Sequence, residues 1–122
     1  MTLIKAVITG VTLAIMLSMV ASRANASCTQ MQQLAREHSD DMARRHNGHC
    51  RSKSDLDHDG FTVRAGSGAR AENVACASSA SAAKALWLRS KEGHRENMML
   101  PYRCKPVVCV GKFCTMEIGP SL

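Results

Sequence analysis

The stretch V-V-C-V-G-K-F-C-T-M-E-I, Val107–Ile118, decides the fold of this chain. Val107–Val110 and Phe113–Ile118 are rich in apolar and β-branched residues, a composition typical of strands. Gly111 and Lys112 separate the two runs, and a Gly-first pair suits a two-residue type II′ turn, because glycine adopts the positive φ that the first turn position requires. The stretch therefore predicts an antiparallel hairpin.

The register of this hairpin predicts a disulfide. A two-residue turn places Cys109 opposite Cys114 in a non-hydrogen-bonded pair, where the Cα atoms lie about 4.5 Å apart, a separation that a disulfide tolerates. Alternate residues then form one core face of the hairpin: Val107, Cys109, Cys114, Met116 and Ile118. The spacing does not choose among the three pairings open to the remaining cysteines, which are Cys28, Cys50, Cys76 and Cys104.

Two helical patterns and a long polar stretch precede the hairpin. Thr29–Arg45 has apolar residues at helical spacing and is followed by an Asn-Gly pair, a typical helix stop. His49–Val74 is polar and rich in Gly, Ser, Asp and Arg, which predicts a long irregular excursion. A Ser-Ser pair can cap a second helix that runs to about Ser90, and a short turn over 94–100 follows it.

The first 26 residues have the features of an export signal. Lys5 supplies a charged start, Ala6–Ala21 is an apolar run, and Ala24-Asn25-Ala26 is an A-x-A cleavage pattern. The apolar span is short for a membrane anchor, so we expect cleavage and no membrane span afterwards. Residues 27–122 then form one disulfide-stapled domain that is periplasmic or secreted.

Length and composition exclude several classes of protein. A chain of 122 residues is too short for a two-domain enzyme, a doubly wound nucleotide-binding sheet or a repeat array. With two Phe, one Trp and one Tyr the core is thin, and six cysteines supplement it. Loss of Lys5 and Arg23 with the leader lowers the formal charge from +6 to +4. The remaining basic residues are scattered, which predicts an ordinary solvated surface and no nucleic-acid partner.

Two familiar site motifs are incomplete or absent. The run D-x-D-x-D-G at 55–60 opens like a calcium loop, but the position that needs a bidentate glutamate is Gly66. The chain also lacks the G-x-S-x-G pattern of serine hydrolases. Chemistry must therefore be sought in residues that are dispersed along the chain.

Four dispersed motifs occur in order: H-S-x-x-M-A at 38–43, E-N-V-A at 72–75, W-x-x-S at 87–90 and G-H-R-x-N at 93–97. Together with His58 and Arg64, this set resembles the bacterial branch of the CAP superfamily, which comprises cysteine-rich secretory proteins, antigen 5 and pathogenesis-related 1 proteins and is also called the SCP-like domain. The resemblance covers about Leu34 to Gly119. It implies an α+β fold, a compact α-β-α sandwich of the CAP type with a small antiparallel sheet.

The resemblance also implies a cleft with two histidines and two glutamates, which in some members bind a divalent metal. Glu72 matches one of the glutamates. Its partner is His58 by local context and by distance from Glu72, whereas counting forward from the first helix favours His49. Ser90 stands where the second glutamate is expected. The second histidine, expected ahead of the last strand, has no counterpart. His94 is a possible substitute, but its Gly-His-Arg-x-Asn setting favours a structural cap.

These matches define the expected site. The binding cleft is expected to comprise His58, Glu72, His94, Ser90 and His49. Structural roles are implied for His38, Arg64, Asn73, Trp87 and Asn97. Because one Glu and one His rarely hold zinc without a third ligand, we expect no cofactor and at most weak binding of a divalent metal.

The expected function is that of an exported binding module for a lipid, an envelope glycan or a protein partner, acting through the cleft near His58 and Glu72. Two alternatives stay open. One is a hydrolase in which these two residues activate water, with or without a metal. The other is a purely structural, disulfide-stabilised interaction protein. The incomplete set of cleft residues favours binding over catalysis.

We expect the mature N-terminus to be Ser27, because signal peptidase cleaves after an A-x-A pattern. Mass spectrometry of the exported protein tests this expectation. A mass that retains residues 1–26 would contradict it and indicate a membrane-tethered form.

Overall fold

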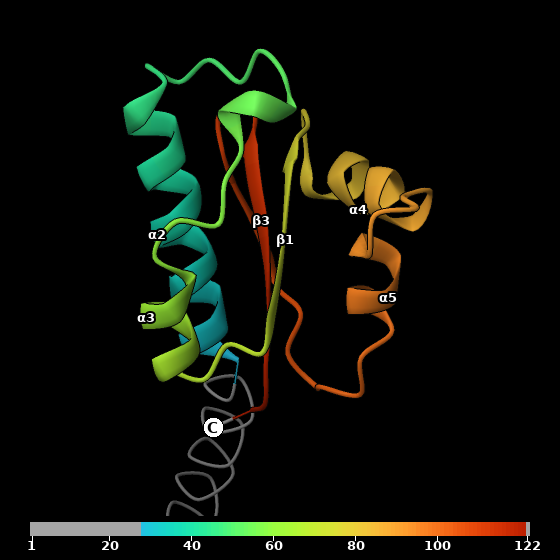
Figure 1. The fold of residues 1–122 in the computed structure, drawn as a ribbon. Coiled ribbons are helices and arrows are strands. Elements are labelled where there is room, and N and C mark those ends of the chain that lie inside the picture. The colour runs from blue at the N-terminus through green and yellow to red at the C-terminus, as the bar shows by residue number, and fades with distance from the viewer. Residues whose placement is uncertain (1–27, 122) are drawn as a thin grey trace, which may run out of the picture.

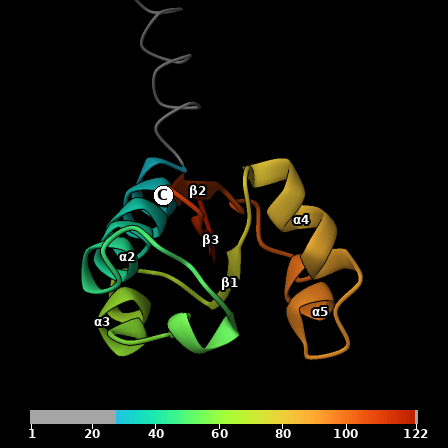
Figure 2. The same cartoon turned by 90° about the horizontal axis from the view of Figure 1, so that it is seen from above.

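The computed structural model describes residues 28–121, so the predicted leader at 1–26 lies outside the described residues. Three antiparallel strands, β1 (Ala71–Cys76), β2 (Val107–Val110) and β3 (Phe113–Ile118), form one sheet in the order β1-β3-β2. Figures 1 and 2 show helices on both faces of this sheet. The fold is therefore α+β, with a small antiparallel sheet between two helical layers.

The helices divide between the two layers. The first layer holds α2 (Thr29–Arg45), the single 3₁₀ turn η1 (Lys53–Asp55) and α3 (Phe61–Gly66). The second holds α4 (Ala80–Leu88) and the short α5 (His94–Met98). Both helices over 29–45 and 80–88 lie where the apolar spacing and the serine cap predict them.

Helix α2 covers one face of the sheet with its apolar side. Its buried residues recur every three or four positions: Met31, Leu34, Ala35, His38, Ser39, Met42 and Ala43. Met42 and Ala43 pack against Val74 of β1 and Phe113 of β3. The opposite side of the helix is exposed and carries charged pairs one turn apart, as expected for a helix on the surface of a domain.

The hairpin has the predicted register. Val110 pairs with Phe113 and Cys109 with Cys114. Gly111 has a φ of 59°, and Asn47 is the only described non-glycine residue with a positive φ, so only the first turn position is left-handed. This is the pattern of a type II′ turn. The predicted core face is also present, because Cys114 and Met116 are buried together with Trp87 of α4.

The stretch over 49–74, which the composition predicts to be irregular, instead contains η1, α3 and the first half of β1. The prediction was wrong at β1 because the sequence A-E-N-V-A-C is poor in strand-forming residues. The strand exists through pairing with β3, which runs without interruption from Ala71 opposite Ile118 to Cys76 opposite Phe113. The predicted turn over 94–100 likewise contains the helix α5.

The described residues contain three disulfides: Cys28–Cys104, Cys50–Cys76 and Cys109–Cys114. The third joins the two residues that the hairpin register brings together. Disulfides persist in oxidising compartments, so this set fits an exported protein. Within residues 28–121, no helix combines the length and the apolar character that crossing a membrane requires.

The three disulfides are expected to contribute unequally to stability. Cys28–Cys104 links residues 76 apart and Cys109–Cys114 links residues 5 apart. Loop-closure entropy then predicts a loss of about 4 kcal/mol for the double variant Cys28→Ala/Cys104→Ala and about 2 kcal/mol for Cys109→Ala/Cys114→Ala. Urea unfolding of both variants measures the difference. Equal losses would show that native-state contacts outweigh the entropy of the unfolded chain.

Candidate functional site

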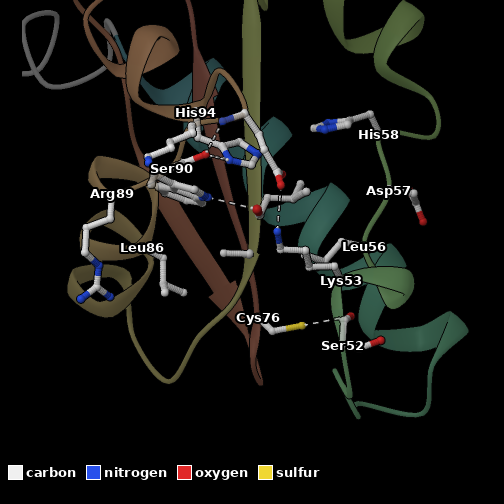
Figure 3. A pocket seen from close by; sticks show the side chains of 15 residues that line it. Ser52, Lys53, Leu56, Asp57, His58, Cys76, Leu86, Arg89, Ser90 and His94 are labelled. Atoms are coloured by element: carbon white, nitrogen blue, oxygen red, sulfur yellow. Dashed lines mark hydrogen bonds and ion pairs between the residues drawn. The ribbon is translucent and has the colours of Figure 1, made fainter.

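A cleft of about 560 Å³ opens between the two helical layers. Its floor is strand β1 at Val74, Ala75 and Cys76. One wall is the segment 52–58, and the other is α4 with the loop that leads into α5 (Figure 3). The cleft therefore lies beside the edge strand of the sheet, where residues from both layers face one another.

The wall formed by residues 52–58 is tied to the floor. The disulfide Cys50–Cys76 joins its start to the end of β1. The carboxylate of Asp55 then accepts hydrogen bonds from the backbone and the side chain of Arg51, which closes a tight turn. This turn places Leu56 against the cleft, where its apolar side chain forms part of the lining.

The opposite wall is tied to the floor by Trp87. Its indole Nε1 donates a hydrogen bond to the carbonyl of Val74 at 3.0 Å, and only 2% of the residue is exposed. Leu86, the preceding residue on α4, lines the cleft and remains 43% exposed. A large apolar side chain that stays exposed inside a hollow is available for contact with a ligand.

Charged side chains also line the cleft. Lys53 Nζ donates a hydrogen bond to Glu92 at 3.1 Å, and this pair joins the two walls (Figure 3). Arg89 and Lys91 add positive charge on the α4 side, and Asp57 adds negative charge on the other. Apart from its two histidines, the lining carries three cationic and two anionic side chains.

His58 and Glu72 are in contact. His58 Nδ1 lies 2.6 Å from the Glu72 carboxylate, within the hydrogen-bonding reach that the sequence predicts. Arg64, on α3, holds the same carboxylate through two hydrogen bonds of 2.6 and 3.0 Å. His58 lines the cleft, whereas Glu72 is buried beneath it. Any effect of Glu72 on a ligand therefore passes through the ring of His58.

Glu72 is ionised in the folded protein. Burial alone raises the pKa of this carboxyl, but hydrogen bonds with His58 and Arg64 outweigh burial and lower the pKa to about 2. With the carboxylate as acceptor, His58 donates its Nδ1 hydrogen. The pair thus fixes both the orientation and the tautomer of the histidine at the cleft wall.

Glu117 is a second carboxyl in this network, and the sequence analysis missed it. It lies on β3 directly opposite Glu72 and is fully buried. Burial and the nearby negative charge of the Glu72 carboxylate raise the pKa of Glu117 to about 9, so the side chain is neutral. A signal was available, because Glu117 alternates with the predicted core face and a helix on each side of the sheet buries both faces.

Ser90 and His94 form a second polar contact, on the α4–α5 wall. Ser90 Oγ lies 2.9 Å from His94 Nδ1, and both residues line the cleft. Burial lowers the pKa of His94, the neighbouring charges of His58 and Lys53 lower it further, and Glu92 opposes the shift. His94 is therefore neutral at pH 7, because its pKa lies below the ordinary value of 6.5.

Asparagine side chains attach α5 to the sheet. Asn73 Nδ2 donates to the backbone carbonyl of His94, and Asn97 Nδ2 donates to Asn73 Oδ1, both at 2.9 Å. His38 is buried on α2, where its Nε2 donates to the carbonyl of Asp57 at 2.8 Å. These three residues, like Arg64 and Trp87, hold elements together around the cleft.

The structure brings some of the predicted site residues together and separates others. His58, Ser90 and His94 line the cleft, and Figure 3 shows the two histidines on opposite walls. Glu72 lies underneath. His49 is exposed and does not line the cleft. Within the described residues, no group of three or more His, Cys, Asp and Glu side chains is arranged to hold a metal ion.

Comparison of the chain with protein-family models, with curated proteins and with solved structures finds no match. Function is therefore inferred from the residues that line the cleft and from the carboxylate network beneath it.

Replacement of Glu117 by glutamine is expected to remove a pH dependence of stability. The folded-state pKa of about 9 exceeds the ordinary value of 4.5, so the folded protein keeps a proton that the unfolded chain releases. The free energy of unfolding must then fall as pH rises from about 4.5 to about 9. Urea unfolding at about pH 5 and about pH 9 measures this fall, expected to be on the order of a few kcal/mol.

The Glu117→Gln variant is expected to lose this fall because its amide does not titrate. Glu96→Gln is the matched control at an exposed position and is expected to keep it. Equal stability of the unaltered protein at both pH values would contradict a buried neutral carboxyl at Glu117.

Proposed function

We propose that this chain is an exported binding module whose cleft takes an amphipathic ligand, with a lipid favoured over an envelope glycan or a protein partner. The single observation that supports this most is the cleft itself, about 560 Å³ in volume, whose exposed surface is mostly apolar although polar and charged side chains also line it. Small-molecule sites typically have volumes of about 300–1,000 Å³ and apolar walls with a few polar groups.

The distribution of polarity favours the lipid. Leu56 and Leu86 supply an apolar lining suited to a hydrocarbon chain. Lys53, Arg89 and Lys91 are among the residues that line the cleft, and cationic side chains attract an anionic headgroup. Trp87, the only tryptophan of the chain, is too deeply buried to stack on a sugar ring.

We also propose that the chain belongs to the bacterial branch of the CAP superfamily and acts in the periplasm or after secretion. Two observations support the assignment. The motif residues His58, Ser90 and His94 converge on one cleft although they are far apart in the sequence. Helices cover both faces of the small sheet, as the α-β-α sandwich of that superfamily requires.

Leu86 and Leu88 provide a matched test of the cleft. Both are exposed leucines on α4, but only Leu86 lines the cleft. The anionic apolar dye 1-anilinonaphthalene-8-sulfonate is expected to bind saturably, and Leu86→Asp is expected to weaken binding at least about tenfold through the loss of one buried leucine contact. Leu88→Asp is expected to leave the affinity unchanged. Fluorescence titration measures both.

Competition then identifies the natural class of ligand. Envelope lipids are expected to displace the dye, whereas glycans and divalent metals are not. Displacement by a glycan alone would overturn the preference for a lipid. Dye binding that both leucine variants weaken equally, or that neither weakens, would contradict the cleft as the binding site.

A further inference from the structure

The contact between Ser90 and His94 has the hydrogen-bond arrangement of a nucleophile and its base. The backbone N–H of Glu92 donates to Ser90 Oγ at 3.1 Å. Because this oxygen already accepts a hydrogen bond, its own hydrogen is free to be donated to His94 Nδ1, 2.9 Å away. A hydroxyl that donates to an imidazole nitrogen is the activated form of a serine nucleophile.

The histidine is in the protonation state that this role needs. Burial lowers its pKa, so the ring is neutral at neutral pH, and in the tautomer that carries its hydrogen on Nε2 the Nδ1 atom accepts the hydrogen bond from Ser90. The charged groups that act on the ring are Glu92, His58 and Lys53. The ring is positioned because the backbone carbonyl of His94 accepts the hydrogen bond from Asn73, a buried residue of β1.

The residue after Ser90 offers a hydrogen-bond donor for the negative charge that develops on the carbonyl oxygen of an ester during attack. Within residues 28–121, no residue accepts a hydrogen bond from the backbone N–H of Lys91. Lys91 directly follows Ser90 and lines the same cleft. The N–H of the residue after the nucleophile is a recurrent oxyanion donor in serine hydrolases.

We propose that Ser90 and His94 form a catalytic dyad that hydrolyses carboxylic esters whose apolar acyl chain lies along the cleft. The inference rests on the proposed function in one respect, because both require a ligand in this cleft, and it adds a reaction to binding. It uses neither Glu72 nor a metal ion. The acyl chain would contact Leu56 and Leu86, which line the cleft together with the dyad.

The reaction balances with water as the only co-reactant. Ser90 Oγ attacks the ester carbonyl carbon and its proton passes to His94 Nδ1, while the N–H of Lys91 stabilises the oxyanion. The bond to the alcohol oxygen then breaks, and the alcohol leaves with the proton from His94. Water attacks the acyl-serine, His94 accepts the proton of the water, and this proton returns to Ser90 Oγ as the carboxylic acid departs.

The test uses the exported, oxidised protein with a fluorophosphonate probe, which reacts covalently with activated serines. We expect labelling at Ser90, located by peptide mass spectrometry. His94→Asn is expected to slow labelling on the order of 100-fold, the contribution of a general base. The labelling rate is expected to rise with pH through a pKa below 6.5, as His94 loses its proton.

Matched variants separate the dyad from a general effect on folding. Ser90→Ala is expected to abolish labelling and the hydrolysis of p-nitrophenyl esters. Ser78→Ala, at an exposed serine outside the cleft, is expected to change neither. Circular dichroism confirms that each variant is folded. Labelling at other serines only, or labelling of Ser90 that His94→Asn leaves unchanged, would overturn the dyad.

Dye titration distinguishes the failure of the dyad from the failure of the proposed function. Absence of labelling with dye binding that still depends on Leu86 would refute catalysis and leave the binding module in place. Absence of both would refute the cleft as a ligand site and the dyad with it. Labelling of Ser90 together with dye binding that depends on Leu86 supports both proposals.

Discussion

The buried carboxylate of Glu72 is the constraint on which the arrangement of the cleft depends. An unpaired charge in a protein interior costs several kcal/mol, so the chain must bring partners to it from separate elements. Arg64 comes from α3, and His58 comes from the loop before α3. Satisfying one charge on β1 therefore fixes where the segment between α2 and β1 runs, and this segment provides one wall of the cleft.

The second wall is fixed by neutral hydrogen bonds to the same strand. Trp87 donates to the carbonyl of Val74, and Asn73 donates to the carbonyl of His94. The β1 strand thus has two roles, because its pairing with β3 completes the sheet while its side chains and carbonyls hold both layers. A strand whose sequence is poor in strand-forming residues is maintained by these tertiary interactions. The cleft lies beside this strand because both walls are attached to it.

Elements that form because of neighbouring residues can be predicted from the sequence. Elements that form only by pairing with residues far along the chain cannot. The hairpin depends on Gly111 and alternating apolar residues, and α2 on helical spacing, so both are predictable. Strand β1 depends on β3, about 40 residues away, and no local pattern reveals it. The contact of His58 with Glu72 was predictable through the family resemblance. Glu117 was missed because a glutamate in a strand suggests an exposed position unless both faces are known to be buried.

The two carboxyls and the Ser90–His94 contact divide the polar groups of the site into two sets with different uses. Glu72 and Glu117 share a low-dielectric position in which one is held ionised and the other neutral, and neither lines the cleft. Such a pair fixes geometry, because transfer of the Glu117 proton to Glu72 would leave a buried charge on Glu117, away from the hydrogen bonds that His58 and Arg64 make to Glu72. Groups that act on a ligand must instead be reachable from the cleft. Ser90 and His94 line the cleft and meet this condition, while the carboxylates hold the opposite wall in place.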